Sequence, residues 1–187
     1  MTNYAIVMTK WVGLYGTVRI AKEKKEDLLT RLPEYLIEDA ARFEKYLSTE
    51  KDTETAKGVN ECETIPLGAG GLYKALYELS KEKKCGITAF AKAIPIRQET
   101  IEISEFYDIN PYMLNSQGSI LIITPREKVK DLLLKLAKNE IPAAMIGRFT
   151  GGNDCIVTNG ERRTYIKPPK EDGLWCVIPK ERSDGES

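Results

Sequence analysis

A glycine-rich turn at residues 68–71 is the stretch of this sequence whose residue types could bind a ligand. It separates an extended segment, residues 64–67, from a helical pattern that begins at Leu72. Backbone N–H groups at a helix start and the positive end of the helix dipole favour an anion. Tight chain packing is the alternative explanation, because the glycine spacing fits no standard phosphate-binding motif and Lys74 lies within the expected helix. The candidate ligand-binding residues of the turn are Gly68, Ala69, Gly70 and Gly71.

The residue types missing from the sequence exclude several kinds of enzyme. There is no histidine, which is the commonest general base and neutral metal ligand. The four cysteines form no C-x-x-C pair, so the usual zinc and redox motifs are absent. We therefore expect no zinc hydrolase, no Ser-His-Asp triad and no metal site, and the catalytic residues stay unknown. The cysteines, expected as unpaired thiols, are Cys62, Cys85, Cys155 and Cys176.

The charge balance argues against a nucleic-acid or membrane partner. The chain has 28 Lys and Arg residues against 28 Asp and Glu residues, for a formal net charge of +0. No basic block adjoins an aromatic platform, as a nucleic-acid surface would require. The first residues contain neither a basic segment nor a long apolar run, so we expect no signal peptide and no membrane span. The expected location is cytoplasmic.

A row of carboxylates, Glu99, Glu102 and Glu105, follows the three-residue spacing of one helix face. Carboxylate oxygens are ligands that Mg²⁺ accepts. A solvated helix face is the more typical explanation, since Ile101 lies on the other side of the same pattern. We therefore predict no metal ligand in this row.

The elements that must position the turn begin with a strand. Residues 4–9 form an apolar, partly β-branched run that suits a buried strand, and the alternation at residues 18–20 predicts a second extended segment. Residues 22–47 have a helical pattern that Pro33 divides into two helices. We interpret the polar residues 48–58 as a connection without a role in chemistry.

The second half of the chain predicts a split β-α-β unit followed by a hairpin. Residues 120–123 and 141–146 have the pattern of two strands with a helix between them. Thr124 as the N-cap, a proline after it and Glu127 would close a capping box at the start of this helix. The pair Asn159-Gly160 favours a type I′ hairpin turn.

Six segments of the sequence, in a fixed order over about residues 6 to 170, resemble a known family. They are residues 9–17 (TKWVGLYGT), 70–79 (GGLYKALYEL), 94–103 (IPIRQETIEI), 110–112 (NPY), 116–122 (SQGSILI) and 141–147 (IPAAMIG). Together they resemble the C-terminal domain of the AIR synthase (PurM-like) superfamily. Within it, they are most similar to the branch of the hydrogenase maturation factor HypE.

The resemblance implies an α/β (α+β) fold in which a mixed β-sheet is layered with helices, partly ferredoxin-like. It implies a domain over residues 1–170. The tail, residues 171–187, is polar except for residues 174–178, so we expect it to dock near those residues and then to fray. Full-length members place an ATP-binding domain before this one and form dimers, and ATP and substrate meet in the cleft that faces the glycine turn. ATP activates an amide or thioamide oxygen, and in the hydrogenase branch a carbamoylated C-terminal cysteine becomes a thiocyanate.

The resemblance also extends the candidate ligand-binding site to Ser116, Gly118 and Ser119, which it places beside the turn. Family members usually have an Asp with a His or Arg before the glycines, whereas residues 64–67 contain neither acid nor base. We therefore expect any ligand contact at the turn to come from backbone amides. No cysteine stands at the end of the chain, and Cys176 is interpreted as a packed thiol.

Two hypotheses for the function follow. In the first, the chain is the substrate-side domain of a HypE-like maturation factor that works with a separate or missing ATP-binding half. The chain alone would then not be catalytically competent, and ATP and Mg²⁺ would be cofactors only with that half present. Partners would be the ATP-binding domain, a second copy or other hydrogenase maturation proteins. In the second, it is a non-catalytic binding or assembly module that self-associates. A fragment of a purine-pathway AIR synthase fits residues 9–11 and 110–112 less well.

Overall fold

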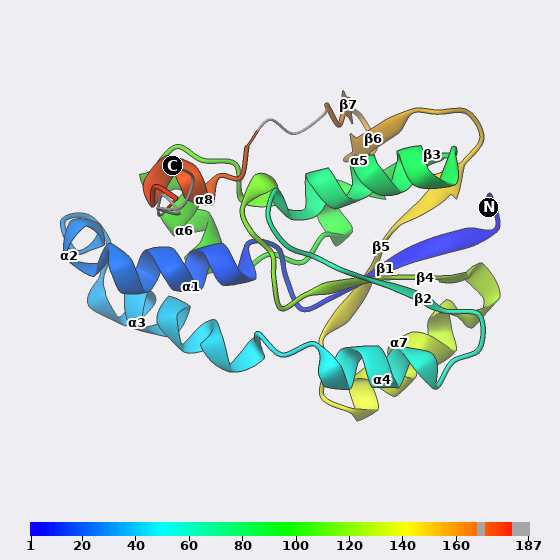
Figure 1. Cartoon of the computed structure of the whole chain (residues 1–187), viewed down its shortest axis with the longest axis horizontal. Helices are drawn as coiled ribbons and strands as arrows, with labels where there is room; N and C mark the ends of the chain where they lie inside the picture. Colours follow the sequence, from blue (N-terminus) through cyan, green and yellow to red (C-terminus); the bar gives the residue numbers. More distant parts are fainter. Residues whose placement is uncertain (168–170, 181–187) are drawn as a thin grey trace, which may run out of the picture.

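The computed structural model describes residues 1–167 and 171–180 (Figure 1). Within them, strands form one mixed sheet in the order β2-β4-β1-β5-β3-β6-β7. Neighbouring strands are antiparallel except for β3 and β6, which are parallel. The predicted mixed sheet layered with helices is therefore confirmed. The strands are β1 (Tyr4–Thr9), β2 (Glu63–Pro66), β3 (Gly86–Phe90), β4 (Ile120–Pro125), β5 (Ala143–Thr150), β6 (Cys155–Thr158) and β7 (Arg163–Tyr165).

Helices cover parts of both sheet faces and form a further layer at one end of the sheet (Figure 1). The α-helices of the described residues are α1 (Leu14–Glu23), α2 (Lys25–Leu28), α3 (Glu34–Arg42), α4 (Glu50–Lys57), α5 (Gly71–Lys83), α6 (Gln98–Phe106), α7 (Val129–Lys138) and α8 (Leu174–Val177). The 3-10 segments are η1 (Phe43–Tyr46), η2 (Ala91–Ala93), η3 (Pro111–Met113) and η4 (Arg126–Lys128).

Strand β1 divides the core because its side chains alternate between the two sheet faces. Ile6 and Met8 pack with α5 on one face, which we call the α5 face. Val7 packs with α4 and α7 on the other, which we call the α7 face. A third cluster joins α1, α3, α6 and α8 at the end of the sheet, and Leu174 and Ile178 are buried in it. The tail therefore packs on the body at α8, while the domain boundary at residue 170 stays a prediction.

The predicted split β-α-β unit is confirmed, but its helix begins later than predicted. Strands β4 and β5 both pair with β1, and α7 connects them. Thr124 does not cap the helix, because it pairs with Ala5 inside the sheet. Pro125 is still extended, with ψ 141, and η4 precedes α7. Sheet pairing thus outweighs the capping box that the local sequence favours.

Two further local predictions need correction. Residues 18–20 are helical, because Gly13 adopts a left-handed conformation (φ 68) after β1 and residues 14–23 form α1. The hairpin at Asn159-Gly160 is present between β6 and β7, but Thr158 pairs with Arg163, so its loop is longer than a two-residue type I′ turn. The Asn159 side-chain oxygen accepts hydrogen bonds from the N–H groups of Glu161 and Arg162 and stabilises this longer loop.

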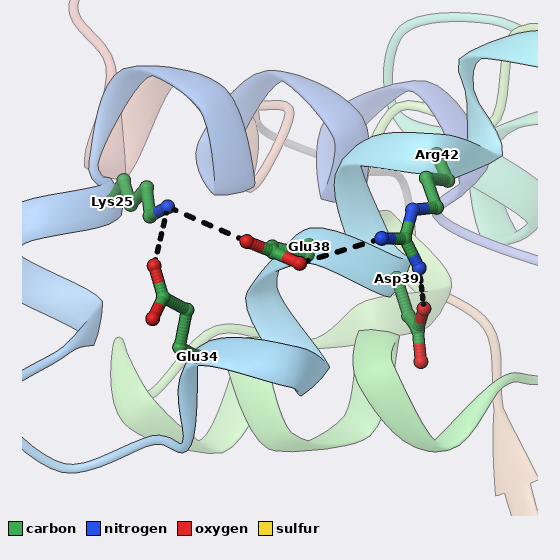
Figure 2. Close-up of polar contacts among 5 residues, drawn as sticks. All are labelled: Lys25, Glu34, Glu38, Asp39 and Arg42. Carbon is green, nitrogen blue, oxygen red and sulfur yellow. Dashed lines mark hydrogen bonds and ion pairs between the residues drawn. The ribbon is translucent and has the colours of Figure 1, made fainter.

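A network of ion pairs joins α2 to α3 on the surface, as Figure 2 shows. Lys25 lies 2.9 Å from Glu34 and 3.9 Å from Glu38. Glu38 lies 3.4 Å from Arg42, which pairs with Asp39 at 2.8 Å. All five side chains are exposed by two-fifths or more, so water screens each pair and its contribution to stability is small.

No helix among the described residues is long and apolar enough to cross a membrane. Residues 168–170 and 181–187 lie outside the described part, and with them most of the segment predicted to fray.

Candidate functional site

The glycine turn adopts a conformation that only glycine takes easily. Gly70 and Gly71 both have left-handed backbone angles, with φ 84 and φ 63. A Cβ on Gly71 would lie 2.6 Å from the carbonyl oxygen of Leu114 and 2.7 Å from that of Tyr112. A Cβ on Gly70 would instead meet the flexible side chain of Lys74. The close approach of residues 112–114 therefore explains why residue 71 is a glycine. Tight packing is thus part of the reason for the glycine-rich turn.

A carboxylate from the tail already lies at the turn. Asp172 is only 4% exposed, and its Oδ2 accepts a hydrogen bond of 2.8 Å from the N–H of Gly70. Its Oδ1 accepts from the N–H groups of Asn115 at 3.0 Å and Leu174 at 2.8 Å. The negative charge expected at the start of α5 is thus supplied by the chain itself, which joins the turn, the loop before β4 and α8.

The other backbone N–H groups at the start of α5 differ in whether they have a hydrogen-bond acceptor. The N–H of Gly71 donates to the carbonyl oxygen of Gly68 at 3.1 Å, and that of Lys74 donates to Gly70 at 3.4 Å. Within the described residues, no acceptor is found for the N–H groups of Leu72 and Tyr73. An external anion at this helix start would therefore have to use these two amides or displace Asp172.

The loop that carries Ser116, Gly118 and Ser119 lies beside the turn, since the N–H of Ser116 donates to the carbonyl oxygen of Gly68 at 3.1 Å. Both serines are fully buried. The Ser116 hydroxyl accepts from the N–H of Gly13 and donates to the carbonyl oxygen of Leu114. The Ser119 hydroxyl donates to the carbonyl oxygen of Trp11. These hydroxyls hold the chain together, and a ligand role for them stays a prediction.

Lys10 fixes the same loop from the other side. Its ammonium group donates to the carbonyl oxygens of Gly118 at 2.8 Å and Ser48 at 2.6 Å. It also pairs with Asp52 at 3.1 Å, and both side chains are almost completely buried. The polar residues 48–58, interpreted as a plain connection, therefore include α4 and one half of a buried ion pair.

Two hollows flank the turn and share Ala69 and Lys74. One of about 180 Å³ lies between the turn, β2 and α5, and one of about 230 Å³ lies between the turn and the tail. Lys74 reaches both and has Glu78 as a distant partner at 3.8 Å. Beside them, the rings of Tyr73 and Tyr112 stack at 5.2 Å, and burial raises the pKa of both phenols. Lys74 is the cation that both hollows share, while carboxylates line each of them, Glu78 and Glu82 in the first and Glu171 and Asp172 in the second, so neither lining has an excess of positive charge.

The remaining chemistry-bearing side chains give no second site. The described residues contain no cluster of acidic and cysteine side chains that could hold a metal ion. Burial raises the pKa of the Cys155 thiol to about 11, which makes it a poor nucleophile at neutral pH. Cys176 is exposed rather than packed, because Leu174 and Ile178 are the residues of this tail segment that face the core.

Sequence patterns missed two parts of this site, Asp172 and the Lys10–Asp52 pair. A signal existed for Asp172, because an Asp side chain typically accepts a hydrogen bond from the backbone N–H two residues further on. It predicts the bond to Leu174, but not the contact with Gly70, which lies 102 positions away. No local signal indicates that Lys10 and Asp52 are buried together.

Comparison with known proteins agrees with this fold. Residues 67–159, which begin immediately before the turn, match the family described as AIR synthase related protein, C-terminal domain. The chain is 29% identical over 91 residues to the carbamoyl dehydratase HypE of Rhodobacter capsulatus, covering 49% of this chain and 24% of that protein. The chain thus matches much less than the full length of this relative.

Solved structures show the same fold. The chain is similar to a HypE–HypF complex with a TM-score of 0.69 and 16% identity, covering 90% of this chain and 54% of that chain. It is similar to HypE in complex with ATP with a TM-score of 0.68 and 16% identity, covering 93% and 53%. The chain thus spans about half the length of these HypE chains. Residues 67–159 thus match the AIR synthase related C-terminal domain, and HypE proteins are among the relatives and structures to which the chain is similar.

Proposed function

We propose that this chain is the substrate-side C-terminal domain of a HypE-like maturation factor, which acts with an ATP-binding half in ATP-dependent activation of an amide or thiocarbamate. The observation that carries the proposal is the family match that begins at the glycine turn. A carbamoyl dehydratase among its relatives, a HypE structure with ATP and a HypE–HypF complex support it. Hydrogenase maturation proteins are therefore the expected partners.

The geometry of the turn fits the binding part of this reaction. The N–H groups of Leu72 and Tyr73, for which the described residues supply no acceptor, and the ammonium group of Lys74 are the groups at the turn that favour a negative charge. Both carboxylate oxygens of Asp172 accept hydrogen bonds from backbone N–H groups, and the side chain is buried, so we assign it a structural role. The chain therefore contributes charge stabilisation, and the groups that activate ATP are expected from the other half. Self-association, the second hypothesis, stays a prediction.

The test is calorimetry of ATP binding with Mg²⁺ by the ATP-binding half of a HypE protein, with and without this chain. The proposal expects the chain to tighten ATP binding about tenfold, equivalent to about 1.4 kcal/mol. Lys74→Glu should abolish most of this gain, whereas Lys81→Glu, on the same helix, should retain it. No gain from the unaltered chain, or an equal loss in both variants, would contradict the proposal.

A further inference from the structure

Among residues 1–167 and 171–180, no helix packs on the part of the α7 face that β3, β6 and β7 form. The helix that packs against β3 and β6 is α5, on the opposite face. Four residues on neighbouring strands pair with one another in a row: Arg148 of β5, Thr88 of β3, Ile156 of β6 and Tyr165 of β7. Their sequence neighbours pack toward α5, so these four side chains point the other way. We call this row the open sheet row, and Tyr165 in it is 62% exposed.

An apolar groove adjoins the open sheet row. It has a volume of about 520 Å³ and lies between α7 and β5, lined by Leu133, Leu134 and Met145 among others. Leu134 is 52% exposed, so it adds apolar surface at the rim of the groove. Met145 pairs with Val7 and Arg148 pairs with Ala5, with a shift of register between the two pairs. Val7 and Ala5 point to the same face of β1, so Met145 and Arg148 point to the same side of β5. Groove and row therefore form one continuous surface.

The charges of this surface have one sign. Arg126 and Lys130 line the groove, Arg148 lies in the open sheet row, and Arg163 is exposed on β7. None of the ion pairs found among residues 1–167 and 171–180 involves these four side chains. The surface thus combines an apolar hollow with unneutralised cations.

We propose that this surface binds an acidic protein segment that places a large apolar side chain in the groove and carboxylates against the surrounding cations. A second copy of this chain is disfavoured, because a two-fold contact would set the same four cations against each other. Nucleic acid is disfavoured by a chain pI of about 6.4 and by the apolar groove. The surface lies across the sheet from α5, so this proposal is independent of the one for the glycine turn.

The experiment uses the full chain, labelled with ¹⁵N, and a synthetic amphipathic peptide in which Leu residues at helical spacing alternate with Glu. Binding should be saturable at low salt and should weaken as salt rises. Amide shifts should be concentrated on α7, β5, β3, β6 and β7. A peptide with Gln in place of Glu and a peptide with Ser in place of Leu should each bind more weakly, by about tenfold or a larger factor.

Variants of the chain locate the binding surface. Arg148→Glu and Lys130→Glu should each weaken peptide binding about tenfold, and Leu134→Gln about fivefold, with unchanged unfolding midpoints because all three side chains are exposed. Lys45→Glu, the same charge reversal on η1, should leave binding within about twofold. Absence of saturable binding, shifts on α1 and α3 instead, or equal effects of Lys45→Glu and Arg148→Glu would overturn the proposal. So would tighter binding of a single-stranded oligonucleotide, or a dimer in sedimentation that Arg148→Glu dissociates.

Discussion

Two groups of charged residues in this chain differ in how deeply they are buried. Around the glycine turn, Lys10, Asp52 and Asp172 are almost completely buried. Lys10 and Asp172 bind backbone groups of distant segments, and Asp52 pairs with Lys10. On α2 and α3, the network of Figure 2 has more charged members, but all of them are exposed and close in sequence. Removing one partner of a buried pair leaves an uncompensated charge, whereas water replaces an exposed partner. The buried group should therefore hold the site together, and the exposed network should contribute little.

The largest effect is expected from Lys10→Met. The substitution leaves Asp52 buried without its cation, and it removes the donor to Gly118 and Ser48. We expect a loss of about 3–5 kcal/mol in the free energy of unfolding, measured by urea denaturation. The double variant Lys10→Met with Asp52→Leu should recover part of this loss, because no charge is then left buried. Equal losses in the single and double variants would show that the ion pair is not what stabilises this region.

A smaller effect is expected from substitution within the turn. Gly71→Ala forces a Cβ against two backbone carbonyl oxygens in a left-handed conformation, so it should cost about 2–4 kcal/mol of stability. Gly70→Ala meets only the side chain of Lys74, which can move, and should cost about 1–2 kcal/mol. Thermal and urea unfolding of the two variants gives the comparison. A Gly70→Ala variant less stable than Gly71→Ala would mean that the approach of residues 112–114 is not what requires glycine.

The smallest effect is expected on the exposed network. Arg42→Gln removes the partner of both Glu38 and Asp39, yet the change in unfolding free energy should be about 0.5 kcal/mol or less. The same variant measured at high salt should differ even less from the unaltered chain. A loss above about 1.5 kcal/mol would remove the distinction between the buried and the exposed charges.

The sequence predicts this fold well where local pattern and tertiary packing agree. The helix between β4 and β5 and the hairpin at Asn159-Gly160 are both present, because periodicity and turn residues determine them locally. Residues 18–20 are predicted as extended but are helical, because the left-handed Gly13 allows α1 to begin directly after it. Thr124 is predicted as a helix cap but lies in the sheet, because it pairs with Ala5. Local pattern does not report such contacts.

The candidate site likewise has one part that the sequence predicts and another that it does not. The turn itself is predictable from its glycines, whereas Asp172 reaches it from a segment 102 positions away. The open sheet row is a comparable case, because Arg148, Ile156 and Tyr165 become neighbours only through strand register. The sequence contains no basic block beside an aromatic platform, since the four cations of this surface come from four different elements, η4, α7, β5 and β7.

Native-state hydrogen exchange at the glycine turn tests the central claim about this site most directly. If Asp172 holds the turn, the amide hydrogens of Gly70 and Asn115 are protected from exchange, as followed by NMR. Asp172→Ala should then speed their exchange about tenfold or more relative to amides in β1, and Asp172→Asn, which keeps one acceptor oxygen, should have a smaller effect. Exchange of Gly70 and Asn115 at the rate of an exposed loop in the unaltered chain, or no change on removing the carboxylate, would contradict the account.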